Sequence, residues 1–212
     1  PNAICQIGSK KDLTEPNVRA TELELYEGLE ASSQNCWPNV KFDIGGINNF
    51  ISPLIPAGFY YKTFMWPKSF WKKVYEPLIR LSAGLGKSPT EPDPDIYDHK
   101  YVHYDVLIIG GGVSGIIAAK MAAKNNLKTL LVDDKKILGG STIYQNNESI
   151  KIDDKLSSEW LKNEIQEIKK LSNLTIKTRT SIAAYHGYNF LLAKENLTDH
   201  LPEEKKKNKI RQ

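Results

Sequence analysis

The sequence predicts an α/β fold for residues 101–212, because two apolar runs of strand length flank a glycine-rich turn and a helix-forming segment. Val106–Ile109 is a short β-branched and aliphatic run that ends at a glycine, as buried parallel strands do. The turn Gly110–Gly115 has the spacing G-x-G-x-x-G and opens the alanine-rich segment Ile116–Ala123. A second apolar run, Thr129–Val132, completes a β-α-β unit of the Rossmann type.

Each glycine of this turn has a physical task in holding a dinucleotide. Gly110 permits the sharp turn out of the strand, Gly112 lets a pyrophosphate approach the backbone, and Gly115 lets the helix pack closely on the sheet. The free N–H groups at the start of the helix would face the phosphates. Asp133 follows the second strand, where a carboxylate can accept hydrogen bonds from ribose hydroxyls and disfavours a 2′-phosphate. The alternative is a glycine-rich turn without a ligand.

The candidate cofactor-binding residues are those of the turn, the two acids after the second strand and a later double glycine. They are Gly110, Gly111, Gly112, Val113, Ser114, Gly115, Asp133, Asp134, Gly139 and Gly140. The double glycine resembles the pattern of the two-dinucleotide-binding flavoprotein superfamily, whose members are glutathione reductase-like. That superfamily binds both FAD and NAD on one fold, so the pattern leaves the choice between them open.

Composition and charge argue against several classes of protein. The chain has 212 residues, of which 40% are hydrophobic, enough for one large domain or for one domain and part of another. Much of its net charge of +4 comes from the tail Lys205–Arg211, which argues against a nucleic-acid-binding face. A membrane span is not expected, because no run of about 18 apolar residues occurs.

Cysteine and histidine usage predicts no metal site. Cys5 and Cys36 have no paired spacing, which argues against a disulfide scaffold, an iron–sulfur cluster or a zinc site and fits the reducing cytoplasm. His99 and His103 could meet on a helix face as metal ligands, but they lie in a linker that runs into a strand. No Ser/His/Asp or Cys/His constellation for nucleophilic catalysis can be argued from the spacing of these residues.

Residues 1–87 are expected to be the end of a truncated N-terminal domain with an irregular, aromatic-rich segment. Ala3–Ile7 is predicted to be a strand, and Arg19–Leu29 a helix capped by Asn17. Phe59–Tyr75 holds eight of the chain's twenty aromatic residues and is interrupted by lysines. Three interpretations stay open for it: a segment that wraps its own domain, a subunit interface, and stacking on single-stranded nucleic acid.

Residues 88–100 are rich in proline and acids and predict an extended linker. The dinucleotide-binding domain follows as residues 101–212. Within it, Lys155–Leu171 has helical periodicity, Leu174–Thr178 is expected to be a third parallel strand, and residues 181–193 a hairpin. The last strand of such a domain is missing, so we expect the domain to be C-terminally incomplete and the chain to be a fragment.

Several phrases spread along the chain together point to one family. They are Glu15-Pro16-Asn17, Leu25-Tyr26-x-Gly28-Leu29, Ser33-Gln34-Asn35-x-Trp37-Pro38, Ala57–Pro67, Tyr75-Glu76-Pro77, Ala83-Gly84-Leu85-Gly86, Asp93-Pro94-Asp95 and Thr198-Asp199-His200-Leu201-Pro202. With the nucleotide-binding stretch, they resemble the alpha (large) subunit of heterotetrameric sarcosine oxidase over essentially the whole chain. The aromatic phrase is far more specific than the glycine fingerprint.

The resemblance implies an enzyme that oxidatively demethylates sarcosine to glycine, reduces oxygen to hydrogen peroxide and passes the one-carbon unit to tetrahydrofolate. It implies NAD at Gly110, Gly112, Gly115 and Asp133, FAD and FMN on the beta subunit, and gamma and delta subunits besides. The resemblance also implies that no catalytic residue for amine oxidation lies in this chain and that the tetrahydrofolate site lies in a part absent from it. We therefore expect the chain alone to be inactive. The alternatives are an FAD-dependent reductase using the same site, the alpha subunit of a related amino-acid dehydrogenase, and an assembly module with a structural nucleotide.

Overall fold

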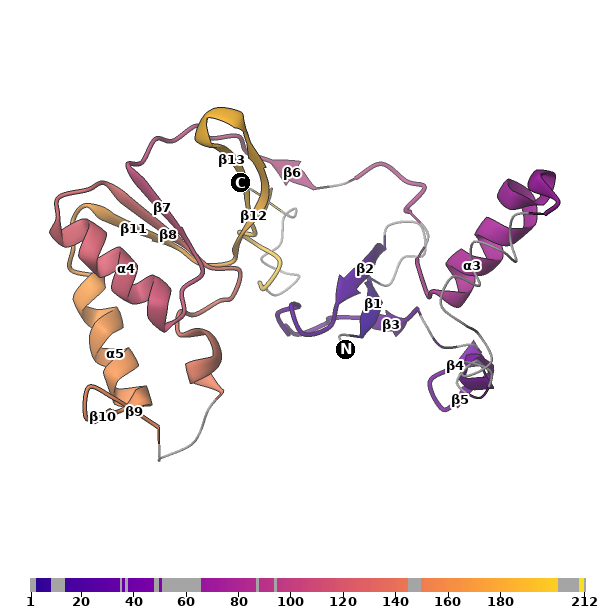
Figure 1. Cartoon of the computed structure of the whole chain (residues 1–212), viewed down its shortest axis with the longest axis horizontal. Coiled ribbons are helices and arrows are strands. Elements are labelled where there is room, and N and C mark those ends of the chain that lie inside the picture. Colours follow the sequence, from indigo (N-terminus) through magenta and orange to yellow (C-terminus); the bar gives the residue numbers. More distant parts are fainter. Residues whose placement is uncertain are drawn as a thin grey trace. The chain divides into compact units, whose positions relative to one another are not determined.

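Two units make up the chain, Pro1–Asp93 and Pro94–Gln212 (Figure 1). The computed structural model describes residues 3–8, 14–34, 36, 38–47, 50, 66–86, 88–93, 95–144, 150–201 and 210–211. Residues 59–65 of the aromatic-rich stretch and most of the basic tail lie outside the described residues.

A three-stranded parallel sheet forms the centre of the second unit. Its strands are β7 (Val106–Ile109), β8 (Thr129–Val132) and β11 (Leu174–Lys177), in the order β11-β8-β7. The register pairs Val106 with Thr129 and Leu174 with Thr129, so the three strands run level with one another. The central strand β8 is buried along its whole length, as its continuous apolar run predicts. The predicted third parallel strand is thereby confirmed.

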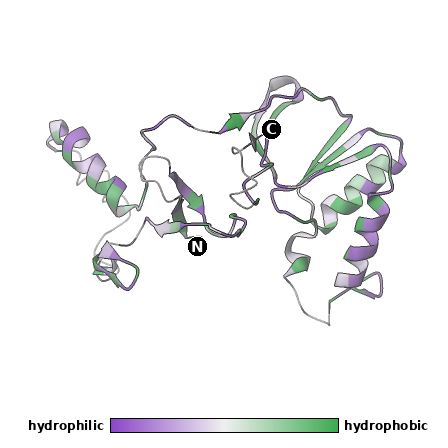
Figure 2. Cartoon of the chain, turned by 180° about the vertical axis from the view of Figure 1, so that it is seen from behind, coloured by the Kyte–Doolittle hydropathy of each residue, from purple (hydrophilic) through white to green (hydrophobic). Residues whose placement is uncertain are grey.

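Two helices, α4 and α5, cover one face of this sheet (Figure 1). Helix α4 (Val113–Lys124) joins β7 to β8, and helix α5 (Ser157–Ile168) precedes β11. Alanines of α4 face the strands and allow close packing, whereas the outer side of α5 is hydrophilic (Figure 2). Helix α5 is shorter than the predicted helix at both ends: Lys155–Leu156 form strand β10 instead, and the helix ends at Ile168, not Leu171.

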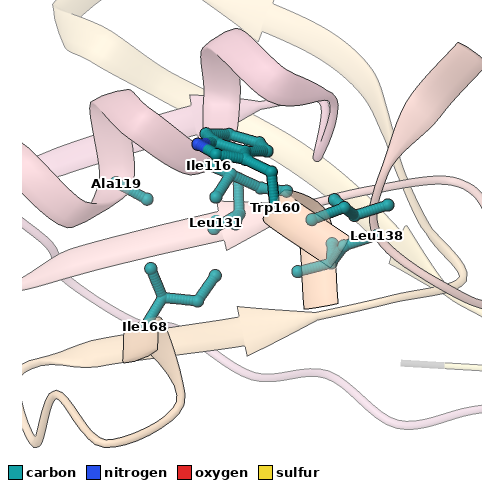
Figure 3. Close-up of a cluster of buried hydrophobic side chains, with 7 residues drawn as sticks. Ile116, Ala119, Leu131, Leu138, Trp160 and Ile168 are labelled. Atoms are coloured by element: carbon teal, nitrogen blue, oxygen red, sulfur yellow. The ribbon is translucent and has the colours of Figure 1, made fainter. Parts of the chain in front are cut away.

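The hydrophobic core lies between the two helices and the central strand (Figure 3). Ile116, Leu131 and Ile168 are fully buried in it, and Trp160 is 4% exposed. The Trp160 indole N–H donates a hydrogen bond to Asp153 Oδ2 at 3.2 Å, so the large side chain is buried with its polar atom satisfied. Leu138 belongs to the same core, so the segment that follows β8 packs against residues of α4 and α5.

Short elements connect β8 to α5 and close the domain. A 3-10 turn, η5 (Gly140–Ile143), is followed by the hairpin of β9 (Lys151–Ile152) and β10. After β11, the hairpin of β12 (Thr180–His186) and β13 (Phe190–Glu195) forms as predicted, joined by the turn η6 (Gly187–Asn189). Lys177 of β11 forms an ion pair with Glu195 of β13, which ties this hairpin to the sheet.

A two-residue strand lies inside the stretch predicted to be a linker. Strand β6 (Ile96–Tyr97) pairs in parallel with β14 (Ile210–Arg211) at the other end of the sequence. The pairing shows that backbone near residue 96 takes part in the second unit.

A second, antiparallel sheet occupies the first unit, with β1 (Ile4–Ile7) between β2 (Glu15–Arg19) and β3 (Ala31–Ser33). Strand β1 confirms one sequence prediction, but the helix predicted over Arg19–Leu29 is wrong. Asn17 does not cap a helix; it lies within β2 at φ 62°, and its side-chain oxygen accepts the backbone N–H of Gly86 at 2.9 Å. The sequence predicted that the Asn17 side chain would cap a nearby helix, whereas in the structure it bonds to a residue 69 positions away.

The remaining elements of the first unit are short or helical. Strands β4 (Pro38–Asn39) and β5 (Phe42–Asp43) form a small ladder that leads into the 3-10 turn η1 (Ile44–Ile47). Further along, η3 (Lys68–Phe70), the π-helical turn η4 (Trp71–Tyr75) and α3 (Glu76–Ser82) form one continuous helical run. The run thus includes the described part of the aromatic-rich segment.

Lys120 of α4 connects the two helices of the second unit electrostatically. Its ammonium lies 2.7 Å from a carboxylate oxygen of Glu164 and 2.6 Å from one of Glu167, both on α5. The hydrogen bond to Glu164, followed by that to Glu167, raises the pKa of Lys120 from its ordinary value of 10.5. The hydrogen bond from Lys120 lowers the pKa of Glu167 from 4.5.

Replacing Lys120 by methionine should lower the free energy of unfolding by about 1–3 kcal/mol at pH 7, because Glu164 loses a charged partner at a largely buried position. Lys120 stabilises the fold fully below pH 10.5, and this stabilisation is lost as the pH rises through its raised pKa. Glu167 contributes to the stability of the fold above pH 4.5, and this contribution is lost as the pH falls through its lowered pKa.

Urea unfolding of wild type and variant across pH would test this expectation. The difference in free energy should be constant near neutrality and shrink at both extremes. Lys124→Met is the matched control, because Lys124 lies one turn along the same helix but is exposed. Equal effects of the two substitutions would show that the Lys120 ion pairs do not hold the helices together.

Candidate functional site

A cavity of about 360 Å³ opens where β7 ends and α4 begins. Its lining residues come from the glycine-rich turn and from the segment after the double glycine: Ile109, Gly110, Gly112, Val113, Ser114, Gly115, Gly139, Ser141 and Thr142. This is the carboxyl edge of the parallel sheet, where open α/β folds bind their ligands. The sequence prediction and the cavity therefore coincide at the turn.

The turn from β7 into α4 requires glycine at two positions. Gly110 has φ 99°, a left-handed conformation, and its N–H donates to the Val132 carbonyl at 2.8 Å. At Gly115, a Cβ would overlap the backbone carbonyl oxygen of Gly110. Helix α4 can therefore start directly beneath the end of the strand only because residue 115 has no side chain.

The start of α4 has the features of an anion site. The first helical hydrogen bond runs from the Ile116 N–H to the Gly112 carbonyl at 2.9 Å, so the N–H groups of residues 113–115 precede the helical ladder. A Cβ at Gly112 would meet no atom within 4 Å and would project into open space at the cavity. The backbone here thus leaves room for a phosphate beside exposed N–H donors, and the residues present fit a dinucleotide.

Asp133 ties the glycine turn to the end of the central strand. One carboxylate oxygen accepts the Gly111 N–H at 2.6 Å, and the other accepts the Lys135 N–H at 2.7 Å. Its backbone N–H donates to the Lys177 carbonyl of β11. Asp133 is 7% exposed and is not among the residues that line the cavity. The neighbouring Asp134 is exposed and lies 3.2 Å from the ammonium of Lys135.

The double glycine packs directly on the glycine turn. The Gly139 N–H donates to the Gly111 carbonyl at 2.7 Å, and a Cβ on Gly140 would lie 3.1 Å from the Cα of Gly112. Two segments that are far apart in the sequence therefore form one wall of the cavity. The sequence predicted Gly139 and Gly140 as candidate cofactor-binding residues, but it did not predict their contact with the glycine turn.

Six of the ten predicted residues line the cavity: Gly110, Gly112, Val113, Ser114, Gly115 and Gly139. Gly111, Asp133, Asp134 and Gly140 lie behind or beside the lining. Ser141 and Thr142 line the cavity but were not predicted, because the sequence there indicates only a polar loop. The only feature of the sequence that could have placed these two residues at the cavity is their position directly after the double glycine.

No metal site accompanies this cavity in the part of the chain that the structure describes. No three histidine, cysteine, aspartate or glutamate side chains there gather as metal ligands. His99 and His103 lie between β6 and β7 outside any helix, so the geometry considered for a histidine pair does not form. Within the same described residues, no helix combines the length and apolar character needed to cross a membrane.

Comparison with known proteins links this site to redox enzymes. Residues 105–205 match the family model of FAD dependent oxidoreductases. Sarcosine oxidase subunit alpha from Rhizobium meliloti (strain 1021) is 42% identical over 203 residues, which cover 96% of this chain and 20% of that subunit. The sarcosine oxidase subunit alpha of Corynebacterium sp. (strain U-96) is 31% identical over 121 residues, 57% of this chain and 12% of the relative.

Among solved structures, the L-proline dehydrogenase from P. horikoshii matches with a TM-score of 0.37 and 23% identity, over 51% of this chain and 20% of that one. This overlap is partial for both chains. The sequence similarity, in contrast, extends through both units of the chain. The chain spans about a fifth of the length of the sarcosine oxidase alpha subunit from Rhizobium meliloti and is similar to it along nearly its whole length, and residues 105–205 match the family model of FAD dependent oxidoreductases.

Proposed function

We propose that the chain is the nucleotide-binding part of the alpha subunit of a cytoplasmic sarcosine oxidase complex and that it holds NAD at Gly110–Gly115. The observation that carries the proposal is the cavity at the carboxyl end of β7, which combines a side-chain-free backbone with the exposed N–H groups at the start of α4. The pyrophosphate would lie against Gly112 and accept hydrogen bonds from the N–H groups of residues 113–115.

We place the ribose of the nucleotide beside the carboxylates of Asp133 and Asp134. Each Asp133 carboxylate oxygen already accepts one backbone N–H and has capacity for a further hydrogen bond from a ribose hydroxyl. The fixed position of this carboxylate disfavours a 2′-phosphate by charge repulsion, which supports NAD over its phosphorylated form. Asp134 is exposed beside it and adds a second negative charge.

In the complex, oxidation of sarcosine to glycine would take place on the flavins FAD and FMN of the beta subunit, with oxygen as the oxidant and tetrahydrofolate as the one-carbon acceptor. The gamma and delta subunits would complete the heterotetramer. We assign no catalytic residue to the described part of this chain and expect the chain alone to have no oxidase activity. Its contribution would be binding and positioning.

A second candidate places FAD in the same cavity and makes the chain an FAD-dependent oxidoreductase or the alpha subunit of a related amino-acid dehydrogenase. The match of residues 105–205 to the FAD dependent oxidoreductase family favours this alternative. FAD shares the adenosine and pyrophosphate of NAD, so the glycine turn suits either dinucleotide.

Identification of the bound nucleotide separates the two candidates. The full-length protein, purified from its source, should release NAD when it is denatured, as identified by chromatography. The separated alpha subunit should be colourless, because NAD has no visible absorbance. A yellow alpha subunit that releases FAD would overturn the NAD assignment and move the redox centre to Gly110–Gly115, and release of neither would contradict the nucleotide site itself.

A further inference from the structure

The cavity at the glycine turn is lined by uncharged residues. Glycines make up four of the nine lining residues, and the other five carry an aliphatic side chain or a hydroxyl group. The donors offered to a ligand are therefore neutral: the N–H groups at the start of α4 and the hydroxyls of Ser114, Ser141 and Thr142. Neutral donors and a helix dipole, equivalent to roughly half a positive charge, compensate one negative charge on a phosphate better than two.

A buried negative charge lies directly behind this lining. The Asp133 carboxylate accepts the Gly111 N–H at 2.6 Å, and Gly111 lies between two lining residues, Gly110 and Gly112. Asp133 is 7% exposed, so salt screens its charge only weakly. A phosphate placed against Gly112 is therefore repelled by this carboxylate, and the repulsion increases with the charge on the phosphate.

The lysines of the adjoining elements have carboxylate partners. Among the described residues, three lysines of α4, β11 and the segment after β8 form ion pairs: Lys120 with Glu164 and Glu167, Lys177 with Glu195, and Lys135 with Asp134. Lys136 and Arg179 lie in the same segments as Lys135 and Lys177 but do not line the cavity. No lining residue therefore offers a positive charge to the second negative charge of a terminal phosphate.

Sites that bind terminal phosphates are built differently. A lysine or arginine is their usual partner, and in the P-loop a lysine follows the last glycine of the turn. Here Ile116 follows Gly115, and this isoleucine is fully buried in the core. The start of α4 therefore contributes backbone donors to the cavity but no ammonium group.

We propose that this site selects phosphates that carry one negative charge each, as in the pyrophosphate of a dinucleotide, and discriminates against a terminal phosphate with two. This inference rests on the proposed function, and it applies to NAD and FAD alike because both contain this pyrophosphate. A terminal phosphate loses its second proton with a pKa of about 6, so ADP carries the additional charge at neutral pH. The uncharged lining thus separates dinucleotides from mononucleotides.

Two ligands that differ by one charge test this inference: ADP and the methyl ester of its terminal phosphate. Nucleotide-free full-length protein is titrated with each at low salt by calorimetry, with NAD and FAD as references. At about pH 8 we expect the methyl ester to bind about tenfold more tightly than ADP, because its terminal phosphate carries one charge less. The affinity for ADP should rise as the pH falls through the pKa of its terminal phosphate, whereas the affinity for the methyl ester should stay constant.

A cation added to the lining should reverse this preference. Ser141→Lys places an ammonium group in the cavity wall, so ADP should then bind more tightly than its methyl ester. The matched control is Tyr144→Lys, because Tyr144 lies in the same segment but is 77% exposed and outside the lining. The control should keep the preference of the wild type. Asp133→Asn removes the buried negative charge and should narrow the difference between the two ligands.

Equal binding of ADP and its methyl ester at about pH 8, with NAD or FAD still bound, would overturn the inference and leave the dinucleotide site standing. A parallel rise of both affinities at low pH would also contradict it, because a protein group would then be titrating instead of the ligand. If neither NAD nor FAD binds, the proposed function itself fails, so the two failures are distinguishable.

Discussion

Gly112→Val should weaken nucleotide binding while the fold persists. The Gly112 backbone is extended, with φ −72° and ψ −175°, which a valine can adopt, and a Cβ there meets no protein atom within 4 Å. The side chain would instead fill the space beside the N–H groups at the start of α4, where we place the pyrophosphate. A steric overlap of about 1–3 kcal/mol corresponds to a loss of affinity of roughly 5- to 150-fold.

Titration of the nucleotide-free full-length protein with NAD, alongside urea unfolding, measures the two effects of this substitution. The free energy of unfolding should change by no more than about 1 kcal/mol, the scale of an altered helix cap. Gly115→Ala is the contrasting variant, because its Cβ would overlap the Gly110 carbonyl oxygen and should destabilise the turn itself. Undiminished affinity of Gly112→Val for NAD would place the nucleotide elsewhere.

Asp133→Ala should destabilise the domain and weaken nucleotide binding together. The substitution removes the acceptors of the Gly111 and Lys135 N–H groups, and Gly111 is buried. Leaving a buried donor unsatisfied costs about 1–3 kcal/mol, and the two hydrogen bonds together make this the largest loss of stability that we expect of a single side chain here. Loss of a ribose contact should add about 1–3 kcal/mol to the free energy of NAD binding.

Asp133→Asn separates these two roles, because the amide keeps one oxygen acceptor and nearly the same shape. We expect it to retain most of the stability but to bind NAD more weakly than wild type, as measured by unfolding and titration. If the asparagine variant binds NAD like wild type, the carboxylate supports the turn and does not contact the ribose. Asp134→Asn serves as the exposed neighbour for comparison and should leave the unfolding free energy nearly unchanged.

The order of elements in the second unit was predictable because its signals are local. The apolar run of β8, the helix after the glycine turn and the parallel strand β11 all appear where the sequence predicts them. Strand burial requires a continuous apolar run, and a tight turn into a helix requires glycine, whatever surrounds them. In the first unit the same kind of reasoning failed at Arg19–Leu29, where the structure has turns instead of a helix. The Asn17 side chain accepts a hydrogen bond from distant Gly86 and caps no helix.

The sequence by itself determined the β-α-β unit, the glycine turn and the acid that follows β8, because sterics and periodicity act within a few residues. Only the tertiary structure decided that the Asp133 carboxylate accepts the Gly111 N–H 22 positions away and that Lys120 pairs with Glu164 44 positions away. It likewise brought Ser141 and Thr142 to the cavity. Such contacts depend on how α4, α5 and the double glycine pack on the sheet, and burial of the shared core fixes that packing.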